Sequence, residues 1–233
     1  MLEVKIFTLY PDLFPGPLDI GIFKKAKQNK IWNLRVINIR DYSKDNHGTV
    51  DDTPFGGGSG MLLRPDILAS ALDNNIKKGE KIIYLSPRGK KFDQNVARSL
   101  SKEKNLNLIC GHFEGVDQRL IETRNIEEYS LGDFVLSGGE PASFVFVDAL
   151  VRLLPGVLGN KDSVKEESFE NHLLEYPQYT KPREWEGKSP PEVLFSGDHA
   201  KIKGWRLSQS EAITRRQRPD LWKKYLEKKN EKH

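Results

Sequence analysis

Short apolar runs alternate with amphipathic segments through the first two thirds of the chain. Five runs rich in β-branched, aromatic and leucine residues predict strands, namely Val4–Leu9, Trp32–Ile39, Lys81–Leu85, Leu106–Cys110 and Tyr129–Leu136. Between and after them, apolar residues recur at helical spacing in Leu18–Lys30, Pro65–Lys78, Asp93–Glu103, Asp117–Thr123 and Pro141–Leu154. Strands that alternate with helices in this way predict an α/β domain with a mainly parallel sheet.

Polar stretches divide the chain further. Asp41–Gly60 is polar and rich in glycine, and a loop of about twenty residues inside a compact domain is usually functional or disordered. The stretch 159–172 is rich in charged and small residues and predicts a flexible linker. The remainder is polar, contains tryptophan and is expected to end in helices. We therefore predict a domain over 1–158, a linker over 159–172 and a helical domain over 173–233.

Composition places the chain among ordinary soluble globular proteins. Of its 233 residues, 37% are hydrophobic and 30% are charged. No apolar run approaches the roughly 20 residues that cross a bilayer, so no membrane association is expected. The first residues do not have the pattern of a signal peptide. The single cysteine, Cys110, excludes an internal disulfide and ends an apolar run, which predicts a buried thiol and a reducing, cytoplasmic location.

Positive charge is concentrated near the carboxyl end. From Glu175 onward there are 14 Lys and Arg against 9 Asp and Glu, whereas the first 174 residues carry 23 against 24. This asymmetry fits a partner that bears phosphates, and it equally fits a solvated helix surface with a frayed tail. The charge alone does not decide between these two interpretations.

Three successive predicted strands end in loops of small residues, Leu85-Ser86-Pro87, Gly111–Gly115 and Leu131–Gly139. In an open parallel sheet, ligands bind beyond the carboxyl ends of the strands, and glycine there lets the backbone approach a ligand closely. Such loops suit an adenine, whose edge offers donors and acceptors, although three ordinary turns remain the alternative. No dinucleotide fingerprint, phosphate loop or H-E-x-x-H motif is present, which disfavours polyphosphate hydrolysis and metalloprotease chemistry, and no metal site is predicted.

Longer blocks carry a specific resemblance. They are Val50–Gly58, Tyr84–Gly89, Gly111–Asp117, Ser130–Glu140 and Pro155–Gly159, followed by Glu175–Pro182 and Trp205–Leu207. In this order they resemble the bacterial tRNA (guanine-N1)-methyltransferases of the TrmD type, from about Phe7 to Trp222. Ordered blocks over nearly the whole chain are far more specific than one short motif.

The resemblance implies a fold, a cofactor and a reaction. The fold would be the SPOUT type, a parallel sheet whose carboxyl end forms a deep trefoil knot, in a homodimer whose active sites are built from both chains. The enzyme would transfer a methyl group from S-adenosyl-L-methionine to N1 of guanine 37 of tRNA, next to the anticodon, where another guanine precedes it. The residues implied to bind the cofactor are Tyr84, Leu85, Ser86, Pro87, Gly111, Phe113, Glu114, Gly115, Ser130, Leu131, Gly132, Asp133, Phe134, Val135, Leu136, Gly138 and Gly139.

The chemistry of the reaction requires a base and a cation. N1 of neutral guanine carries a proton that must leave as the methyl group arrives, while negative charge develops at O6. The resemblance assigns the base to Glu167, where the family usually has aspartate, and the cation to Arg152. From the residues alone, Glu167 would be a solvated linker carboxylate. Arg152 would be the partner of Asp148, four residues earlier on a helix.

Two further groups are implied to bind tRNA. The first lies in the glycine-rich loop and consists of His47, Asp51 and Gly60. The second lies near the carboxyl end, where basic residues would grip the anticodon arm, and consists of Lys201, Lys203, Arg206, Arg215 and Arg216. Trp205 and Trp222 accompany them, and we expect core packing of these rings rather than stacking on bases. Ser59 stands where many relatives have proline, and Pro141-Ala142 replaces a more usual Leu-Pro pair.

Two other functions remain as alternatives. One is a knotted methyltransferase that acts on a ribose 2′-hydroxyl of RNA, which would share the cofactor loops but needs neither the carboxylate at Glu167 nor the block Val50–Gly58. The other is a non-enzymatic RNA-binding protein with the same fold, which the intact glycines of all three loops disfavour. The sequence does not settle whether Mg²⁺ assists the reaction.

Overall fold

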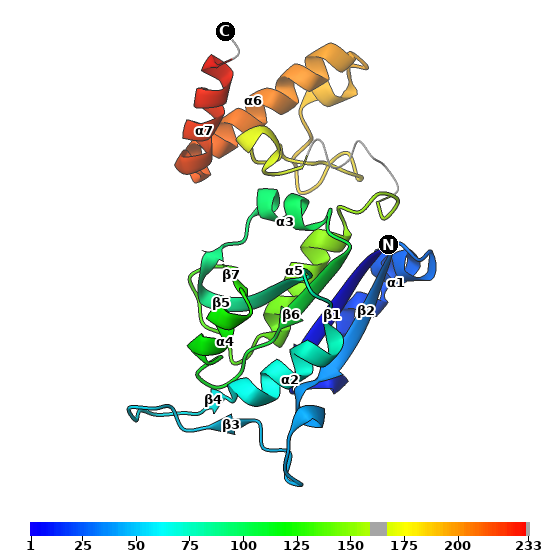
Figure 1. Cartoon of the computed structure of the whole chain (residues 1–233). Helices are drawn as coiled ribbons and strands as arrows, with labels where there is room; N and C mark the ends of the chain where they lie inside the picture. Colours follow the sequence, from blue (N-terminus) through cyan, green and yellow to red (C-terminus); the bar gives the residue numbers. More distant parts are fainter. Residues whose placement is uncertain (159–166, 232–233) are drawn as a thin grey trace. The chain divides into compact units, whose positions relative to one another are not determined.

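A five-stranded sheet, parallel throughout, organises the first of two compact units (Figure 1). The computed structural model describes residues 1–158 and 167–231, and its two units are Met1–Gly159 and Asn160–His233. The strands lie in the order β2-β1-β6-β5-β7, with bounds β1 Leu2–Thr8, β2 Trp32–Asn38, β5 Lys81–Lys91, β6 Asn105–Ile109 and β7 Glu127–Ser130. The predicted α/β class with a parallel sheet is therefore confirmed.

Helices cover both faces of this sheet. On one face lie α1 (Gly21–Gln28), α3 (Gln94–Leu100) and α5 (Glu140–Val151), and on the other lie α2 (Pro65–Asn75) and α4 (Gln118–Thr123). Side chains of β1 show the division, because Val4 and Ile6 pack in the first cluster while Phe7 packs in the second. All three are fully buried, as expected of a parallel sheet with two covered faces.

Local sequence signals explain where these helices begin. The carboxylate of Asp93 accepts hydrogen bonds from the backbone of Asn95 and Val96, both at 3.0 Å, and so caps α3. Asp117 caps α4 in the same manner, accepting from the Arg119 backbone N–H at 2.9 Å. Short 3₁₀ helices complete the unit at Pro11–Leu13, Gly16–Asp19 and Ile39–Tyr42.

Two predicted strand ends are wrong. β5 does not stop at Leu85, because it loops out over Ser86–Gly89 and then pairs with β7 again through Lys90 and Lys91. The strand predicted over Tyr129–Leu136 ends at Ser130. There the Ser130 hydroxyl accepts from the Gly132 N–H at 3.2 Å and turns the chain, so the following apolar residues leave the sheet.

The glycine-rich loop contains a little regular structure. A two-stranded antiparallel ladder joins β3 (Asp51–Asp52) to β4 (Leu62–Leu63). The following helix ends at Asn75, earlier than predicted, and Ile76 continues in an extended conformation.

The second unit ends in the two helices α6 (His199–Gln217) and α7 (Pro219–Asn230). This confirms the predicted helical end. The stretch 173–198 contains just one short 3₁₀ helix, Glu192–Phe195, and another precedes it at Glu170–His172. Prolines limit helix formation in this stretch, namely Pro177, Pro182, Pro190 and Pro191. Buried Thr214 ties the stretch to α6, because its hydroxyl accepts from the Leu174 N–H at 2.8 Å.

Candidate active site

The irregular part of β5 around Ser86 and Pro87 and the loops that follow β6 and β7 line one cavity of about 240 Å³. It is lined by every residue predicted to bind the cofactor except Asp133. The structure adds lining residues that the sequence did not single out, namely His112, Tyr129, Ser137 and Ala142. The loops therefore meet at the carboxyl edge of the sheet, where an α/β domain places its ligands.

Glycines make this cavity by leaving room for neighbouring groups. A Cβ at Gly111 would lie 2.6 Å from the ring of Tyr84, and one at Gly115 would lie 2.8 Å from its hydroxyl oxygen. A Cβ at Gly139 would lie 2.6 Å from the Cα atom of Cys110, which is itself buried. The Gly139 N–H donates to the Gly111 carbonyl at 2.8 Å, so the third loop is tied to the second through backbone atoms.

Burial of Cys110 agrees with its predicted role as a core thiol. Its side chain has no exposed surface, and burial raises the pKa of the thiol well above its usual range. A thiolate nucleophile is therefore disfavoured at this position.

A buried carboxylate lies directly behind the cavity. Glu140 begins α5 and is 1% exposed. Its Oε1 accepts from the Thr8 hydroxyl at 2.6 Å, and its Oε2 lies 3.2 Å from Nε2 of His112. The ring of Tyr10 packs against His112 with centroids 4.8 Å apart. The favourable field of the helix N-terminus also stabilises a negative charge here, so this group fixes the loop after β6 against β1 and α5.

Arg152 lies at the end of α5 and donates its backbone N–H to the Asp148 carbonyl at 3.2 Å. Burial raises the pKa of Asp148, and the positive charge of Arg152 opposes this rise. The charge relation predicted from the four-residue spacing is therefore present. Arg152 follows the C-terminal end of α5, whereas Ala142, the residue of this helix that lines the cavity, lies near its N-terminal end.

Glu167 belongs to the second unit and is half-buried. The backbone just after it is unusual, because Phe169, Asn171 and His172 all have positive φ values, of 76°, 47° and 63°. Non-glycine residues in this conformation store strain that the surrounding structure must hold. Two hydrogen bonds stabilise this backbone conformation, one from the Phe169 N–H to the Leu173 carbonyl at 2.7 Å and one from the Glu175 N–H to the Ser168 hydroxyl at 3.0 Å.

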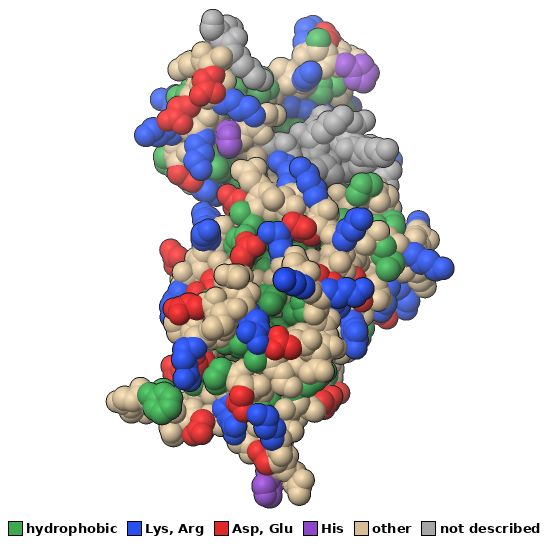
Figure 2. All heavy atoms as spheres, in the orientation of Figure 1, with side chains coloured by type: hydrophobic (Ala, Val, Ile, Leu, Met, Phe, Trp, Pro, Cys, Tyr) green, Lys and Arg blue, Asp and Glu red, His purple; other side chains and the backbone are tan. Residues whose placement is uncertain are grey.

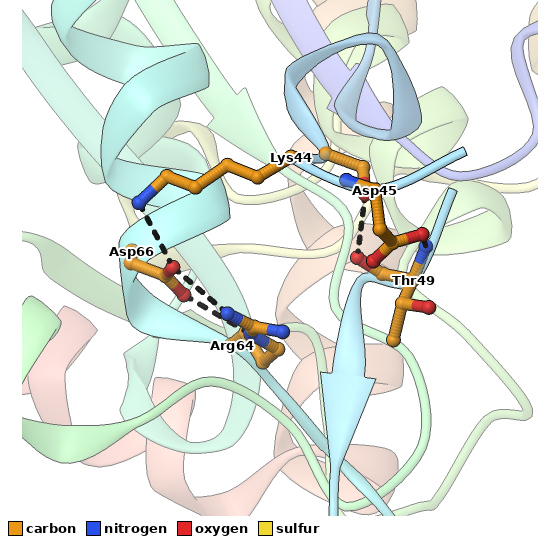
Figure 3. A network of polar contacts seen from close by, with 6 residues as sticks. Lys44, Asp45, Thr49, Arg64 and Asp66 are labelled. Carbon is orange, nitrogen blue, oxygen red and sulfur yellow. Dashed lines mark hydrogen bonds and ion pairs between the residues drawn. The ribbon is translucent and has the colours of Figure 1, made fainter. Parts of the chain in front are cut away.

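The loop that carries His47 is fixed by polar contacts (Figure 3). The Asp45 carboxylate accepts from the backbone N–H groups of His47 at 2.8 Å and Thr49 at 3.2 Å. These hydrogen bonds lower the pKa of the Asp45 carboxyl, and the bond from the Thr49 N–H has the largest effect. Asp66 accepts from Arg64 through two bonds of 3.0 and 3.2 Å and from Lys44 at 3.3 Å, which ties the loop to the start of α2.

The other two residues predicted from this loop lie on either side of its tip. Asp51 is half-buried in β3, and His47 is exposed. Gly60 has a φ of +91°, and a Cβ there would overlap the carboxylate of Glu114, which lines the cavity. The loop therefore reaches the edge of this cavity at Gly60.

The five basic residues predicted near the carboxyl end all lie on α6. Lys201 pairs with Asp198 at 3.3 Å, while Arg206 places its guanidinium 4.8 Å from the ring centroid of Tyr176. On the face that Figure 2 shows, Lys and Arg side chains are interspersed with Asp and Glu in both units.

Both tryptophans that accompany these residues are partly buried. Trp205 lies against Tyr179 with ring centroids 6.3 Å apart, and Trp222 lies against Tyr225 at 5.3 Å. The rings therefore pack within the unit, as expected, while part of each remains accessible.

Within residues 1–158 and 167–231, no group of three or more His, Cys, Asp and Glu side chains has the arrangement of a metal site. No helix in these ranges has the length and apolar character that spanning a bilayer requires.

Comparison with known proteins gives a consistent result over the whole chain. The family profile described as tRNA (Guanine-1)-methyltransferase TrmD matches residues 2–224. A tRNA (guanine-N(1)-)-methyltransferase of Pelagibacter ubique (strain HTCC1062) is 69% identical over 230 residues, which are 99% of this chain and 100% of the relative. Proteins of the same name are 51% identical in Wolbachia pipientis wMel, over 94% of each chain, and 49% identical in Rhodospirillum rubrum, over 97% of this chain and 94% of the relative.

Proposed function

Since the chain belongs to the tRNA (guanine-1)-methyltransferase family, we propose that it transfers a methyl group from S-adenosyl-L-methionine to N1 of a guanine in tRNA. The guanine is the one at position 37, beside the anticodon, and another guanine precedes it. The observation that carries the proposal is the cavity at the carboxyl edge of the sheet, which gathers nearly all the residues expected to bind the cofactor. A tRNA substrate assigns the reaction to the cytoplasm.

The cavity suits an adenosyl group with a short charged chain. Its walls combine backbone donors and acceptors beside glycines with the apolar side chains of Leu85, Leu131 and Leu136. Backbone groups can read the edge of an adenine, while the apolar side chains contact its faces. When bound, the cofactor supplies a methyl group already activated by the sulfonium, so the protein must position it and exclude water.

We further propose that the carboxyl end of the sheet is tied in the trefoil knot of the SPOUT fold. Support comes from the close passage of Gly139 across Cys110 and Gly111, where only a hydrogen atom fits between the two segments. Knots are rare among folds. A knotted crossing would fix the three loops relative to one another before the cofactor arrives.

Glu167 is our proposed general base for the N1 proton, and Arg152 the cation that stabilises negative charge at O6. A guanidinium is permanently charged and offers a planar set of donors, which suits a carbonyl oxygen that gains charge. A carboxylate such as that of Glu167 can accept the N1 proton when it lies within hydrogen-bond reach of N1. His47, Asp51 and Gly60 would contact the target region of the tRNA, and the basic residues of α6 would hold its phosphates.

We also propose a homodimer with active sites shared between the chains. Around the cavity, large apolar side chains are solvent-exposed in the single chain, including Phe134 at 53% and Val135 at 86%. Exposed apolar side chains that cluster beside a site are typical of an interface. The division into a catalytic domain over 1–158, a linker and a tRNA-binding domain over 173–233 belongs to the same proposal.

The deciding experiment incubates the protein with labelled S-adenosyl-L-methionine and unmodified tRNA and identifies the methylated nucleoside by mass spectrometry. We expect N1-methylguanosine at position 37 and loss of product when the preceding guanine is changed. A ribose-methylated product would instead indicate the 2′-hydroxyl reaction. Binding of tRNA without any methyl transfer would indicate a non-enzymatic RNA-binding protein.

Glu167→Gln tests the base, because glutamine keeps the shape but cannot accept the proton. We expect a fall in kcat of at least about 10²-fold, the usual contribution of a positioned base, with unchanged affinity for the cofactor. Glu167→Asp should retain most activity. Glu170→Gln, a matched change three residues away, should turn over normally, and a normal rate in Glu167→Gln itself would remove Glu167 from the mechanism.

A further inference from the structure

A second and larger cavity lies wholly within the unit Asn160–His233. Its volume is about 470 Å³, nearly twice that of the cofactor cavity. Three segments form it, namely the non-helical stretch 176–183, the 3₁₀ helix Glu192–Phe195 with Pro190 before it, and one side of α6. None of its lining residues comes from the first unit.

Aromatic rings form much of its wall. The rings of Tyr179 and Trp205 lie 6.3 Å apart, and Tyr176 and Phe195 line the same space. Tyr179 is 50% exposed and Phe195 is 47% exposed. Both side chains are therefore accessible to a ligand, whereas Trp205 is half-buried.

The charged side chains of the wall are all positive, namely Lys181, Arg183 and Arg206. Arg183 lies 4.3 Å from the ring centroid of Phe195, so the cation and the ring are already assembled. The carboxylate of Glu192 lies 3.7 Å from Arg183, but it is 84% exposed and outside the lining. Solvent screens such an exposed pair, so the cavity keeps a net positive field.

We propose that this cavity binds a single unpaired nucleotide of the tRNA, with its base against the rings of Tyr179 and Trp205 and its phosphate near Lys181 and Arg183. Proteins recognise unpaired bases by stacking them on aromatic side chains and hold the backbone with cations. An apolar peptide would fill the aromatic part but would bring no negative charge to Lys181 and Arg183. The proposal rests on tRNA as the proposed substrate and adds a contact to an unpaired base by residues remote in sequence from the cofactor loops.

Tyr179→Ala in the full-length protein tests the stacking contact. Loss of one stacked base raises the Kd for unmodified tRNA by about tenfold, and the KM for tRNA should rise in parallel while kcat at saturating tRNA is retained. Tyr179→Phe keeps the ring and should bind as the wild type does. Leu207→Ala removes an exposed apolar side chain from the same helix as Trp205, outside the cavity lining, and should also leave the Kd unchanged.

A fluorescent base locates the nucleotide. Transcripts with 2-aminopurine at successive positions of the anticodon loop should show quenched emission at one position with the wild type and not with Tyr179→Ala. Lys181→Gln should lower the slope of log Kd against log salt concentration by the contribution of one phosphate contact, about 0.7 for a single strand.

The outcomes separate this proposal from the proposed function. If the wild type forms N1-methylguanosine but Tyr179→Ala has the wild-type Kd and quenching, the nucleotide site is refuted and the reaction stands. If the wild type transfers no methyl group yet Tyr179→Ala weakens tRNA binding, the nucleotide site stands and the reaction is refuted.

Discussion

Gly139→Ala is a small change that the structure predicts to be severe. Gly139 has an ordinary right-handed backbone conformation, with φ −80° and ψ −12°, so alanine is not excluded by its own dihedral angles. The obstacle is the neighbouring segment. An added Cβ would lie 2.6 Å from the Cα of Cys110 and 2.8 Å from the N atom of Gly111, both of which are backbone atoms.

The cost follows from these distances. Carbon atoms pack at about 3.5–4.0 Å, so the two segments must separate by about 1 Å. The hydrogen bond from the Gly139 N–H to the Gly111 carbonyl, now 2.8 Å, would then be lost, at about 0.5–1.5 kcal/mol. Overpacking adds about 1–3 kcal/mol. We expect the free energy of unfolding to fall by about 2–4 kcal/mol. The separated loops should also bind the cofactor less well, and a tenfold rise in its Kd would correspond to a loss of about 1.4 kcal/mol of binding free energy.

Urea denaturation and calorimetric titration with S-adenosyl-L-methionine measure the two effects. Gly204→Ala is the matched control, because Gly204 lies in α6 and a Cβ there meets nothing within 4 Å. In that helix alanine should stabilise by about 0.8–1.0 kcal/mol and leave cofactor binding unchanged. Wild-type stability and cofactor affinity in Gly139→Ala would refute the close passage of the two loops.

Two further expectations follow from buried polar groups. Thr214→Val removes the buried hydroxyl that accepts from the part-buried Leu174 N–H, so the second unit should lose about 1–3 kcal/mol of stability, measured by urea denaturation followed through tryptophan fluorescence. Burial, together with the hydrogen bond to Glu127, raises the pKa of Tyr129 to about 12. Because the folded pKa lies above the unfolded value of about 10, the resulting stability is fully present below pH 10 and is lost as pH rises toward 12, which absorbance titration at 295 nm can follow; an ordinary phenol pKa in the folded protein would contradict this.

The pattern of apolar runs predicts the sheet well because parallel strands are buried on both faces. Such strands read as continuous apolar runs, and each of the five lies within two residues of its predicted start. The pattern predicts the ends of β5 and β7 poorly. Leu131–Leu136 is apolar because it lines and rims a cavity, and an apolar run has the same composition whether it enters a sheet or a binding site.

The sequence likewise predicts one part of the candidate site and not another. Loop residues beside glycines were recognisable because close backbone approach requires glycine, and the resemblance named the rest. Glu140 lay inside a recognised block, but its pairing with Thr8 and His112 joins segments far apart in sequence. No local spacing encodes such a contact. Asp133 shows the converse, since it belongs to the same block yet does not line the cavity.

The second cavity was missed for a related reason. Tyr176, Tyr179 and Arg206 lie within the recognised blocks, whereas Phe195 lies in a segment with no motif. Their meeting depends on how a proline-rich stretch folds over α6, which neither periodicity nor charge predicts. The sequence therefore indicated basic residues for tRNA but not the aromatic cavity among them.

A short polar path links α6 to the proposed base. The Thr214 hydroxyl of α6 accepts from the Leu174 N–H, and the N–H of the adjacent Glu175 donates to the hydroxyl of Ser168, which follows Glu167 directly. The helix that would bind tRNA, α6, therefore also positions the backbone next to the carboxylate of Glu167 through these hydrogen bonds. Thr214→Val should consequently lower kcat at saturating tRNA, beyond any effect on Kd, because binding survives while the carboxylate is misplaced. Thr214→Ser restores the hydroxyl and should restore kcat. A variant that lost tRNA affinity with unchanged kcat would show that the path holds the fold together without positioning Glu167.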